Sequence, residues 1–262
     1  MIKLYSFAVN RPDFLFYQYR TFKHFLTDEF EFIVINDGHN DDRMRIQRQA
    51  DLLKLPCHVV VNPRRDTANY GHARSIQYAY ETFIKHDNDI SVMLDGDMFL
   101  ARKYSIREWL GDAQLAGLKQ GREHIEYLWP GIVFMDMGKL PEKDTLSFWP
   151  DLVEGVGVDV GGHSYEYIKA HPEIKVKWMT TGGQITEGNR NIQEKLPPEM
   201  IPVYDSEFHI EVFMNAWVHY ACGTNWYYRT EDYHRRKSDF VFALLENTMN
   251  GSVSLPQSVE VI

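Results

Sequence analysis

A chain of 262 residues with 44% hydrophobic and 14% aromatic side chains is long enough to bury a substantial core, which excludes a disordered protein. Its net charge of -9 argues against a clamp for the nucleic-acid backbone, so any anionic ligand needs a local cation or backbone donors. No apolar stretch reaches the roughly 18 residues of a membrane span, and Cys57 and Cys222 do not suggest a disulfide framework. We therefore expect a cytoplasmic protein with no integral membrane segment and no nucleic-acid partner.

Short apolar runs alternate with amphipathic stretches through the first hundred residues. Helical spacing joins Phe14, Tyr17, Phe22 and Phe25, whereas the continuous apolar run 32–35 is typical of a buried parallel strand. These patterns predict strands over 2–9, 31–36, 58–61 and 90–94, and helices over 13–26, 42–53 and 71–86. Strands that alternate with crossover helices build a parallel sheet.

The rest of the chain is less regular and richer in aromatic residues. It predicts helices near 105–110, 163–170 and 232–246 and strands near 132–135 and 176–179. Because there is no repeat, low-complexity tract or evident linker, we expect a single α/β domain over 1–262. This domain has a mostly parallel central sheet, flanking helices, an irregular second half and a tail at 251–262.

Two carboxylates follow the strand predicted over 90–94. Residues two apart in extended backbone point to the same side, so Asp95 and Asp97 can face one cation, and Gly96 between them has no side chain to block a ligand. Ligands of open α/β sheets bind beyond the carboxyl ends of the strands, which is where this motif lies. It predicts a metal and diphosphate site. The similar run Asp87-Asn88-Asp89 lies at the other end of the strand, and acidic residues in either place could instead be solvated turn residues.

Four ordered segments within residues 2–100 together resemble the nucleotide-diphospho-sugar glycosyltransferases of the GT-A fold. Ala8-Val9-Asn10-Arg11-Pro12 is similar to the strand-to-helix turn that wraps the nucleoside, and Asn36-Asp37-Gly38 to the acidic strand end that contacts the base. Asn69-Tyr70-Gly71-His72-Ala73-Arg74 resembles the glycine-containing helix start that faces the diphosphate. Asp95-Gly96-Asp97 matches the DXD motif of the family.

The resemblance implies that residues 1–100 bind a nucleotide-sugar donor and residues 101–250 an acceptor. The donor contacts that it implies are Ala8, Asn10, Arg11, Asp37, Asn69, His72, Arg74, Asp95 and Gly96. The segment that begins His219-Tyr220-Ala221-Cys222-Gly223 looks like the C-terminal histidine motif of these enzymes, so Asp97, His219 and Asp95 would hold the metal ion. A histidine among aromatic residues could also be an ordinary core side chain.

Carboxylate oxygens together with an imidazole nitrogen suit Mn²⁺ better than Mg²⁺, which is the second choice. An acidic residue at position 37 is compatible with uracil, so a UDP-sugar is the preferred donor. The acceptor can be a glycan, a lipid-linked molecule or a protein.

An inverting enzyme also needs a carboxylate within hydrogen-bonding reach of the acceptor hydroxyl. We select Asp159 as this base because the glycines around it leave room for a sugar, although it could equally bind donor hydroxyls or form a turn. Glu207 is another candidate for the base. Trp226 is the preferred platform for a sugar ring. The run Arg235-Arg236-Lys237 is expected to be a solvated helix face.

Two other functional classes stay open. Haloacid-dehalogenase-like phosphatases also place two aspartates after an apolar strand, with the first, here Asp95, as the nucleophile. They have a small hydroxyl residue two places after the second aspartate, where this chain has Phe99. A non-catalytic nucleotide-sugar or glycan-binding module would keep the same fold without turnover.

Overall fold

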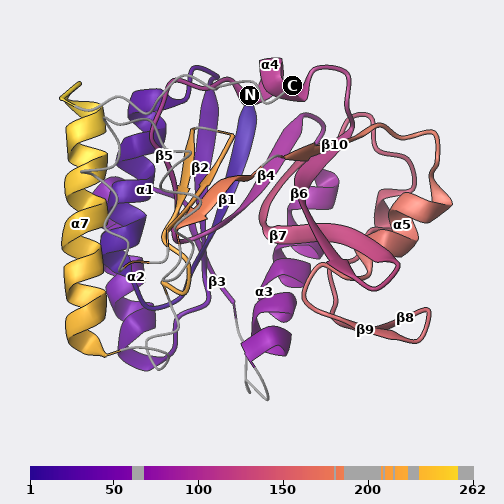
Figure 1. The fold of residues 1–262 in the computed structure, drawn as a ribbon, viewed down its shortest axis with the longest axis horizontal. Helices are drawn as coiled ribbons and strands as arrows, with labels where there is room; N and C mark the ends of the chain where they lie inside the picture. The colour runs from indigo at the N-terminus through magenta and orange to yellow at the C-terminus, as the bar shows by residue number, and fades with distance from the viewer. Residues whose placement is uncertain are drawn as a thin grey trace. The chain divides into compact units, whose positions relative to one another are not determined.

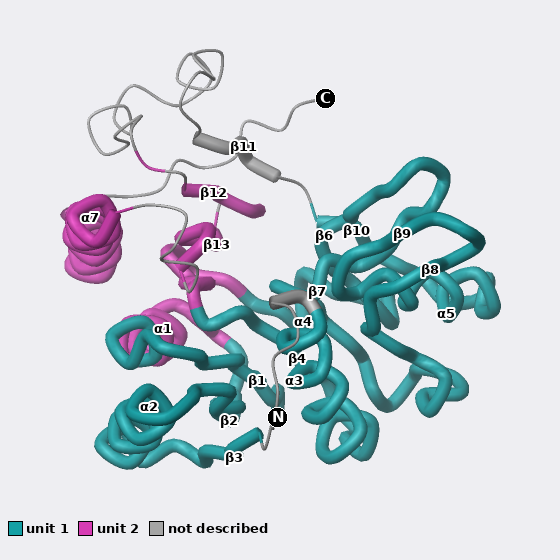
Figure 2. The backbone as a smooth tube through the Cα atoms, turned by 90° about the horizontal axis from the view of Figure 1, so that it is seen from below, with its two compact units in different colours: residues 1–15, 28–96, 105–179 teal, residues 16–27, 97–104, 180–262 magenta. Residues whose placement is uncertain are grey.

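The computed structural model describes residues 1–60, 68–179, 181–185, 208, 210–214, 216–223 and 230–252, with the backbone alone at 68, 69 and 181–185. The chain forms two compact units, each assembled from segments that are distant in the sequence (Figure 2). Unit 1 comprises Met1–Leu15, Asp28–Gly96 and Ser105–Met179. Unit 2 comprises Phe16–Thr27, Asp97–Tyr104 and Thr180–Ile262.

A seven-stranded sheet forms the centre of unit 1, in the order β10-β6-β7-β4-β1-β2-β3 (Figure 1). Its strands are β1 (Ile2–Ala8), β2 (Phe30–Asn36), β3 (Cys57–Val59), β4 (Ile90–Asp95), β6 (Leu115–Arg122), β7 (Ile125–Asp136) and β10 (Val176–Met179). Neighbouring strands are parallel, except that β7 runs antiparallel to both β4 and β6. The structure thus confirms the predicted α/β class with a mostly parallel sheet. The sequence patterns did not predict β6 or the first half of β7.

The helices of unit 1 follow the predicted alternation with the strands. They are α2 (Asn40–Leu53), α3 (Ala68–Thr82), η1 (Ile84–His86), α4 (Ile106–Leu110), η2 (Lys143–Thr145) and α5 (Ser164–Ala170); α1 (Pro12–Phe25) begins in this unit and continues into unit 2. The apolar side of α3, with Ile76 and Tyr80, belongs to one buried cluster with Tyr5 and Phe7 of β1. Burial of this amphipathic face against the sheet is the main reason that α3 is helical.

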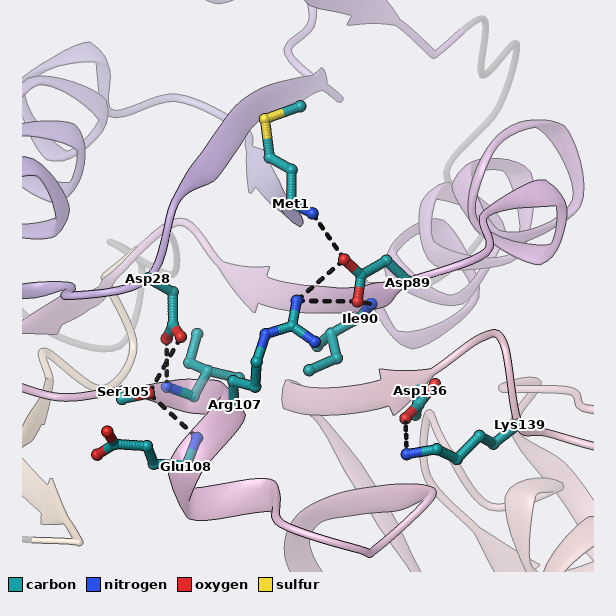
Figure 3. A network of polar contacts seen from close by, with 10 residues as sticks. Met1, Asp28, Asp89, Ile90, Ser105, Arg107, Glu108, Asp136 and Lys139 are labelled. Atoms are coloured by element: carbon teal, nitrogen blue, oxygen red, sulfur yellow. Dashed lines mark hydrogen bonds and ion pairs between the residues drawn. The ribbon is translucent and has the colours of Figure 1, made fainter.

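Buried and half-buried carboxylates meet cations at the amino ends of the central strands. Asp89, just before β4, accepts from the amine of Met1 at 2.6 Å and from Arg107 at 2.9 Å (Figure 3). Asp87 is 7% exposed and accepts from the hydroxyls of Tyr5 at 2.8 Å and Ser91 at 2.7 Å. Lys3 completes this cluster as an ion pair with Asp87. These contacts hold the starts of β1 and β4 together.

The β6–β7 hairpin continues beyond the end of β4. Leu94 near the end of β4 is opposite Ile132, and the pairing of β7 with β6 shifts between Gly117 and Leu118. Residues 118–122 of β6 and 125–129 of β7 therefore extend past the carboxyl edge of the sheet. A second hairpin, β8 (Asp151–Val153) with β9 (Val156–Val158), shares an apolar cluster with Ile125 and Tyr127 of β7.

The described part of unit 2 contains a four-stranded antiparallel sheet in the order β11-β12-β13-β5 and the helices α1 and α7. Its strands are β11 (Thr181–Ile185), β12 (Ile210–Phe213), β13 (Trp217–His219) and β5 (Met98–Leu100). The long helix α7 (Glu231–Met249) packs on α1, where Tyr17 stacks on Phe242 with ring centroids 4.1 Å apart. Among the residues that the structure describes, no helix combines the length and apolar character needed to cross a bilayer.

Candidate active site

The carboxyl ends of β1, β2 and β4 meet at one edge of the unit 1 sheet. Ala8 is paired with Asn36, and Phe7 is paired with Asp95. The chain proceeds from β1 outward to β3 and then returns to the other side of β1 as β4. The strand order thus reverses between β1 and β4, and such a switch point is where open α/β sheets bind ligands. Asp95 lies at this place.

Gly96 follows Asp95 where two backbones approach closely. A Cβ atom at this position would lie 2.7 Å from the carbonyl oxygen of Phe7, closer than real Cβ contacts. Glycine is therefore required for the chain to leave β4 so close to β1. The sequence predicted a glycine that leaves room for a ligand, whereas the structure gives it a packing role against β1.

His72 lies beside Asp95. Its Nε2 lies 3.2 Å from Oδ1 of Asp95, and the imidazole packs edge-on against the ring of Phe7. The two side chains are partly exposed, at 30% for His72 and 21% for Asp95. The structure therefore brings together two of the predicted donor-binding residues, from α3 and β4, at the switch point of the sheet.

Asp37 follows β2 at the same edge and is 2% exposed. Its amide donates to the carbonyl oxygen of Ala8 at 2.8 Å, which continues the β1–β2 ladder by one residue. The adjoining turn is fixed by Asn36, whose Oδ1 accepts from the Gly38 amide at 3.0 Å. A Cβ atom on Gly38 would lie 2.7 Å from the Arg43 backbone nitrogen, so this turn also requires glycine.

Three other predicted donor contacts lie on the turns that adjoin this edge. Asn10 is half-buried two residues after β1, and Arg11 is 7% exposed, with its guanidinium bound to the Asp13 carboxylate at 2.8 and 2.5 Å. Arg74 is half-buried in α3, one position beyond the buried Ala73. Asn69 is in the first turn of α3, but its side chain lies outside the described residues, as do Glu207 and Trp226.

In unit 2, Asp97 and His219 lie next to each other at the ends of two paired strands. His219 of β13 is opposite Met98 of β5, and it is opposite Glu211 of β12 on its other side. His219 Nε2 lies 3.5 Å from Asp97 Oδ1, and Nδ1 lies 2.6 Å from Glu211 Oε2. Asp97 Oδ2 accepts from the Gly223 amide at 3.0 Å. The imidazole is therefore held between two carboxylates.

Burial and neighbouring charges shift the pKa values of Asp97 and His219 in opposite directions. Burial works to raise the pKa of Asp97, but the attraction of His219 and the Gly223 amide outweigh it, so the pKa lies below its usual range. Burial also disfavours the imidazolium form of His219, yet Asp97 and Glu211 together raise the pKa of His219 to about 10. A metal ion at Nε2 would thus replace a proton, as it does in other histidine sites.

The donor set fits a divalent transition metal. Asp97 offers a carboxylate and His219 an imidazole, and Glu211 holds the ring from behind as carboxylates do for many metal-binding histidines. Within the described ranges, no group of three or more His, Cys, Asp or Glu side chains is arranged to hold an ion. A cation at Asp97 and His219 therefore needs further ligands, such as diphosphate oxygens or water.

The sequence motifs do not include Glu211. It is flanked by the apolar residues Ile210 and Val212, in the alternation of apolar and polar residues typical of a half-buried strand. That alternation could have predicted β12, but its four residues are too few to stand out. The pairing of Glu211 with His219 depends on strand register, which the sequence does not specify.

Asp159, the predicted general base, lies just after β9 in unit 1. Its carboxylate forms an ion pair with Arg122 and accepts from Gln120 at 3.3 Å, both on the part of β6 that extends past the sheet edge. The Asp159 amide donates to the hydroxyl of Tyr127 at 3.3 Å. The side chain is 39% exposed. Its role as a base stays a prediction.

The prediction that residues 235–237 form a solvated helix face is wrong for Lys237. Arg235 and Arg236 are exposed and bind Asp232, whereas Lys237 is 1% exposed. The reason is the helical period of α7, which places Lys237 on the same side as the buried Val241 and Leu244.

The solved structures that resemble this chain include the following two, each a distant likeness. A mannosyltransferase, PcManGT from Pyrobaculum calidifontis in complex with GDP-Man and Mn²⁺, aligns with 68% of this chain and 54% of its own, at 11% identity and a TM-score of 0.41. TarS of S. aureus aligns with 56% of this chain and 30% of its own, at 11% identity and a TM-score of 0.38. This chain thus spans about half of the first protein and under a third of the second. Neither a protein-family model nor a curated protein matches the sequence. The α/β class assigned above rests on the order and register of the sheet.

Proposed function

We propose that this protein is a metal-dependent glycosyltransferase that moves a sugar from a nucleotide-diphospho-sugar to a hydroxyl acceptor. The observation that carries the proposal is the Asp97–His219 pair. Asp97 follows strand β4 by two residues, and Asp95 at the end of β4 lies at the switch point of the sheet. A carboxylate and an imidazole held by a second carboxylate are suited to a divalent cation, and Mn²⁺ fits this donor set better than Mg²⁺.

The residues have separate tasks in this proposal. Asp97 and His219 hold the cation, which when bound neutralises charge that develops on the departing diphosphate. Asp95 and His72 bind the ribose or the diphosphate at the edge of the sheet. Asp37, buried after β2, is the proposed contact of the base, and a UDP-sugar stays the preferred donor. Asp159 is the proposed base that takes the proton of the acceptor hydroxyl.

The test is thermal stabilisation by UDP, GDP, CDP and dTDP, each with and without Mn²⁺. A ligand at 100 times its dissociation constant adds about 2.7 kcal/mol, which raises the midpoint of a protein this size by roughly 5 to 10 °C. We expect a shift with one nucleotide, dependent on Mn²⁺ and lost in Asp97→Asn. Asp112→Asn is the matched control, because Asp112 is 79% exposed and pairs with Lys175 at the surface.

Two outcomes would count against the proposal. If no nucleotide stabilises the folded protein, the donor site is absent, and a covalent phosphate trapped on Asp95 would then support the phosphatase class. If a nucleotide binds with Mn²⁺ but no donor is hydrolysed or transferred, the protein is a binding module. Glu211→Gln refines a positive result, since losing the carboxylate behind a metal-binding histidine weakens the metal about 10- to 100-fold.

A further inference from the structure

Lys237 is a buried lysine in the middle of a solvated charge run. The arginines that precede it bind Asp232 at 2.6 and 3.0 Å on the exposed side of α7. Lys237 itself is 1% exposed and lies on the buried side of the helix with Val241. A buried ammonium group is costly unless polar partners compensate it, so its partners indicate what it does.

The ammonium group of Lys237 contacts the segment that follows β13. Its Nζ donates to the carbonyl oxygen of Ala221 at 2.9 Å and lies 4.1 Å from the centroid of the Tyr220 ring, within cation–π range. The Tyr220 hydroxyl donates in turn to the carbonyl oxygen of His234 at 3.1 Å. Helix α7 thus holds this segment at two neighbouring residues.

Residues 220–223, which we call the left-handed turn, have an unusual backbone. Ala221 and Cys222 have φ angles of 50° and 59°, in a region that residues other than glycine rarely adopt. Two such residues in succession persist only where surrounding contacts fix them. The hydrogen bond from Lys237 is made to the carbonyl group that joins these two residues.

The left-handed turn also holds Asp97 at two points. The Tyr220 amide donates to the backbone carbonyl of Asp97 at 3.0 Å, and the Gly223 amide donates to Asp97 Oδ2 at 3.0 Å. The other carboxylate oxygen, Oδ1, is the one that lies toward His219. The direction of the Asp97 carboxylate therefore depends on where the turn places the Gly223 amide.

We propose that Lys237 is a positioning residue for the metal site, which keeps the left-handed turn in the form that presents the Gly223 amide to Asp97. With Oδ2 held in this way, Oδ1 is directed to His219 and to the cation. The proposal rests on the proposed function for the identity of the cation site. The hold of Lys237 on the turn, however, can be measured without any metal.

The experiment compares Lys237→Met, which keeps the length and apolar contacts of the side chain, with Val241→Ala. Val241 is buried one helical turn further along α7 and serves as the control for general destabilisation. Binding of Mn²⁺, alone and with UDP, is measured by the loss of the free-ion paramagnetic resonance signal at a temperature where circular dichroism shows every variant folded. The second readout is the rate at which iodoacetamide alkylates Cys222, an exposed thiol within the turn, followed by mass spectrometry.

We expect Lys237→Met to bind Mn²⁺ about 10- to 100-fold more weakly and to change the alkylation rate of Cys222, as for loss of a group that orients a metal ligand. Val241→Ala should lower the melting temperature and leave both readouts unchanged. Equal Mn²⁺ affinity in Lys237→Met and wild type, or an equal loss in Val241→Ala, would overturn the proposal. If Lys237→Met does not fold, Lys237→Gln, which keeps an N–H donor without the charge, takes its place.

Failure of the proposed function gives a different pattern. If the wild-type protein binds no Mn²⁺ with or without UDP, the proposal of a metal-dependent activity is wrong. In that case the alkylation rate alone decides the role of Lys237. A changed rate supports its hold on the turn, and an unchanged rate overturns it.

Discussion

Two runs of the same spacing, Asp87-Asn88-Asp89 and Asp95-Gly96-Asp97, lie at opposite ends of β4 and have different surroundings. The first pair contacts amines, a guanidinium and hydroxyls: Lys3, Tyr5 and Ser91 contact Asp87. The amine of Met1 and the guanidinium of Arg107 contact Asp89 (Figure 3). The second pair contacts histidines, His72 at Asp95 and His219 at Asp97.

The two pairs differ in whether a metal ion can replace the proton on the group that faces each carboxylate. A lysine or arginine stays protonated at neutral pH and keeps its carboxylate neutralised, so Asp87 and Asp89 act as structural links between strands. An imidazole can bind a metal ion in place of its proton, even where neighbouring carboxylates raise its pKa as they do for His219. The spacing of two aspartates is therefore not informative alone, and the type of cation opposite each one separates a structural pair from a candidate site.

The largest effect should come from Asp97→Asn. If the proposed function holds, we expect roughly a 10³-fold loss of sugar transfer, equivalent to about 4 kcal/mol of barrier, because the proposed cation loses its carboxylate ligand. Donor turnover at saturating Mn²⁺ measures it. Full activity in this variant would mean that the two aspartate pairs do not differ in function.

Asp87→Ala should instead reduce stability by about 3 kcal/mol, because the buried hydroxyls of Tyr5 and Ser91 lose their acceptor. The melting temperature should fall by roughly 6 to 12 °C while activity per folded molecule is retained. Asp144→Ala, at a carboxylate that is 85% exposed, is the control and should change little. A parallel loss of specific activity would contradict a purely structural role for Asp87.

Gly96→Ala tests the close approach of β4 to β1. The added Cβ would lie 2.7 Å from the Phe7 carbonyl oxygen, within a strand pair that cannot separate freely, so we expect a loss of about 2 kcal/mol in urea unfolding. Gly157→Ala is the control, since a Cβ there has no neighbour within 4 Å. Equal midpoints for the two variants would show that the backbone at Gly96 adjusts easily.

The smallest effect should come from Asp89→Asn, and it should depend on pH. Partial burial works to raise the pKa of Asp89, but the Met1 amine, the Ile90 amide and Arg107 outweigh it and lower the pKa to about 2. The ionised carboxylate therefore stabilises the fold at pH values above its ordinary pKa of 3.8. This stabilisation is lost as the pH falls toward 2.

The side chain of Asp89 is 38% exposed, so its contribution should be near 0.5 kcal/mol. Melting temperatures of wild type and Asp89→Asn should differ by a constant small amount above about pH 5 and converge between pH 4 and 2. A difference that grows on acidification would have the wrong sign and would exclude this explanation.

The parts of the fold that the sequence predicts are those with local signals. Strand β2 contains a continuous apolar run, β1 is a short and mostly apolar stretch, and α3 has a clear amphipathic period, so the predicted bounds of each lie within a few residues of the observed ones. Short strands such as β5 and β13, of three residues each, have no such signal and exist because distant partners pair with them. Strand pairing over long separations is a tertiary property.

The residues of the candidate site also differ in whether a local sequence signal points to them. Asp95 and Asp97 could be selected because they follow a predicted strand, and His219 because its segment resembles a known histidine motif, whereas Glu211 required knowledge of the register between β12 and β13. Lys237 was misjudged from its charged neighbours, although the spacing to Val241 and Leu244 already indicated the buried side of the helix.

The pairing of β5 with β13 also determines the order of events during synthesis. Asp97 and Met98 precede their partners on β13 and in the left-handed turn by more than a hundred residues of chain. At about 5 to 20 residues per second, a ribosome needs on the order of 10 s to cover that distance. The strands β1 to β4 have all been made by then, but the carboxylate of Asp97 has neither its histidine nor its turn. The end of unit 2 that holds the proposed metal site is therefore completed late in translation, well after the strands that carry Asp37 and Asp95.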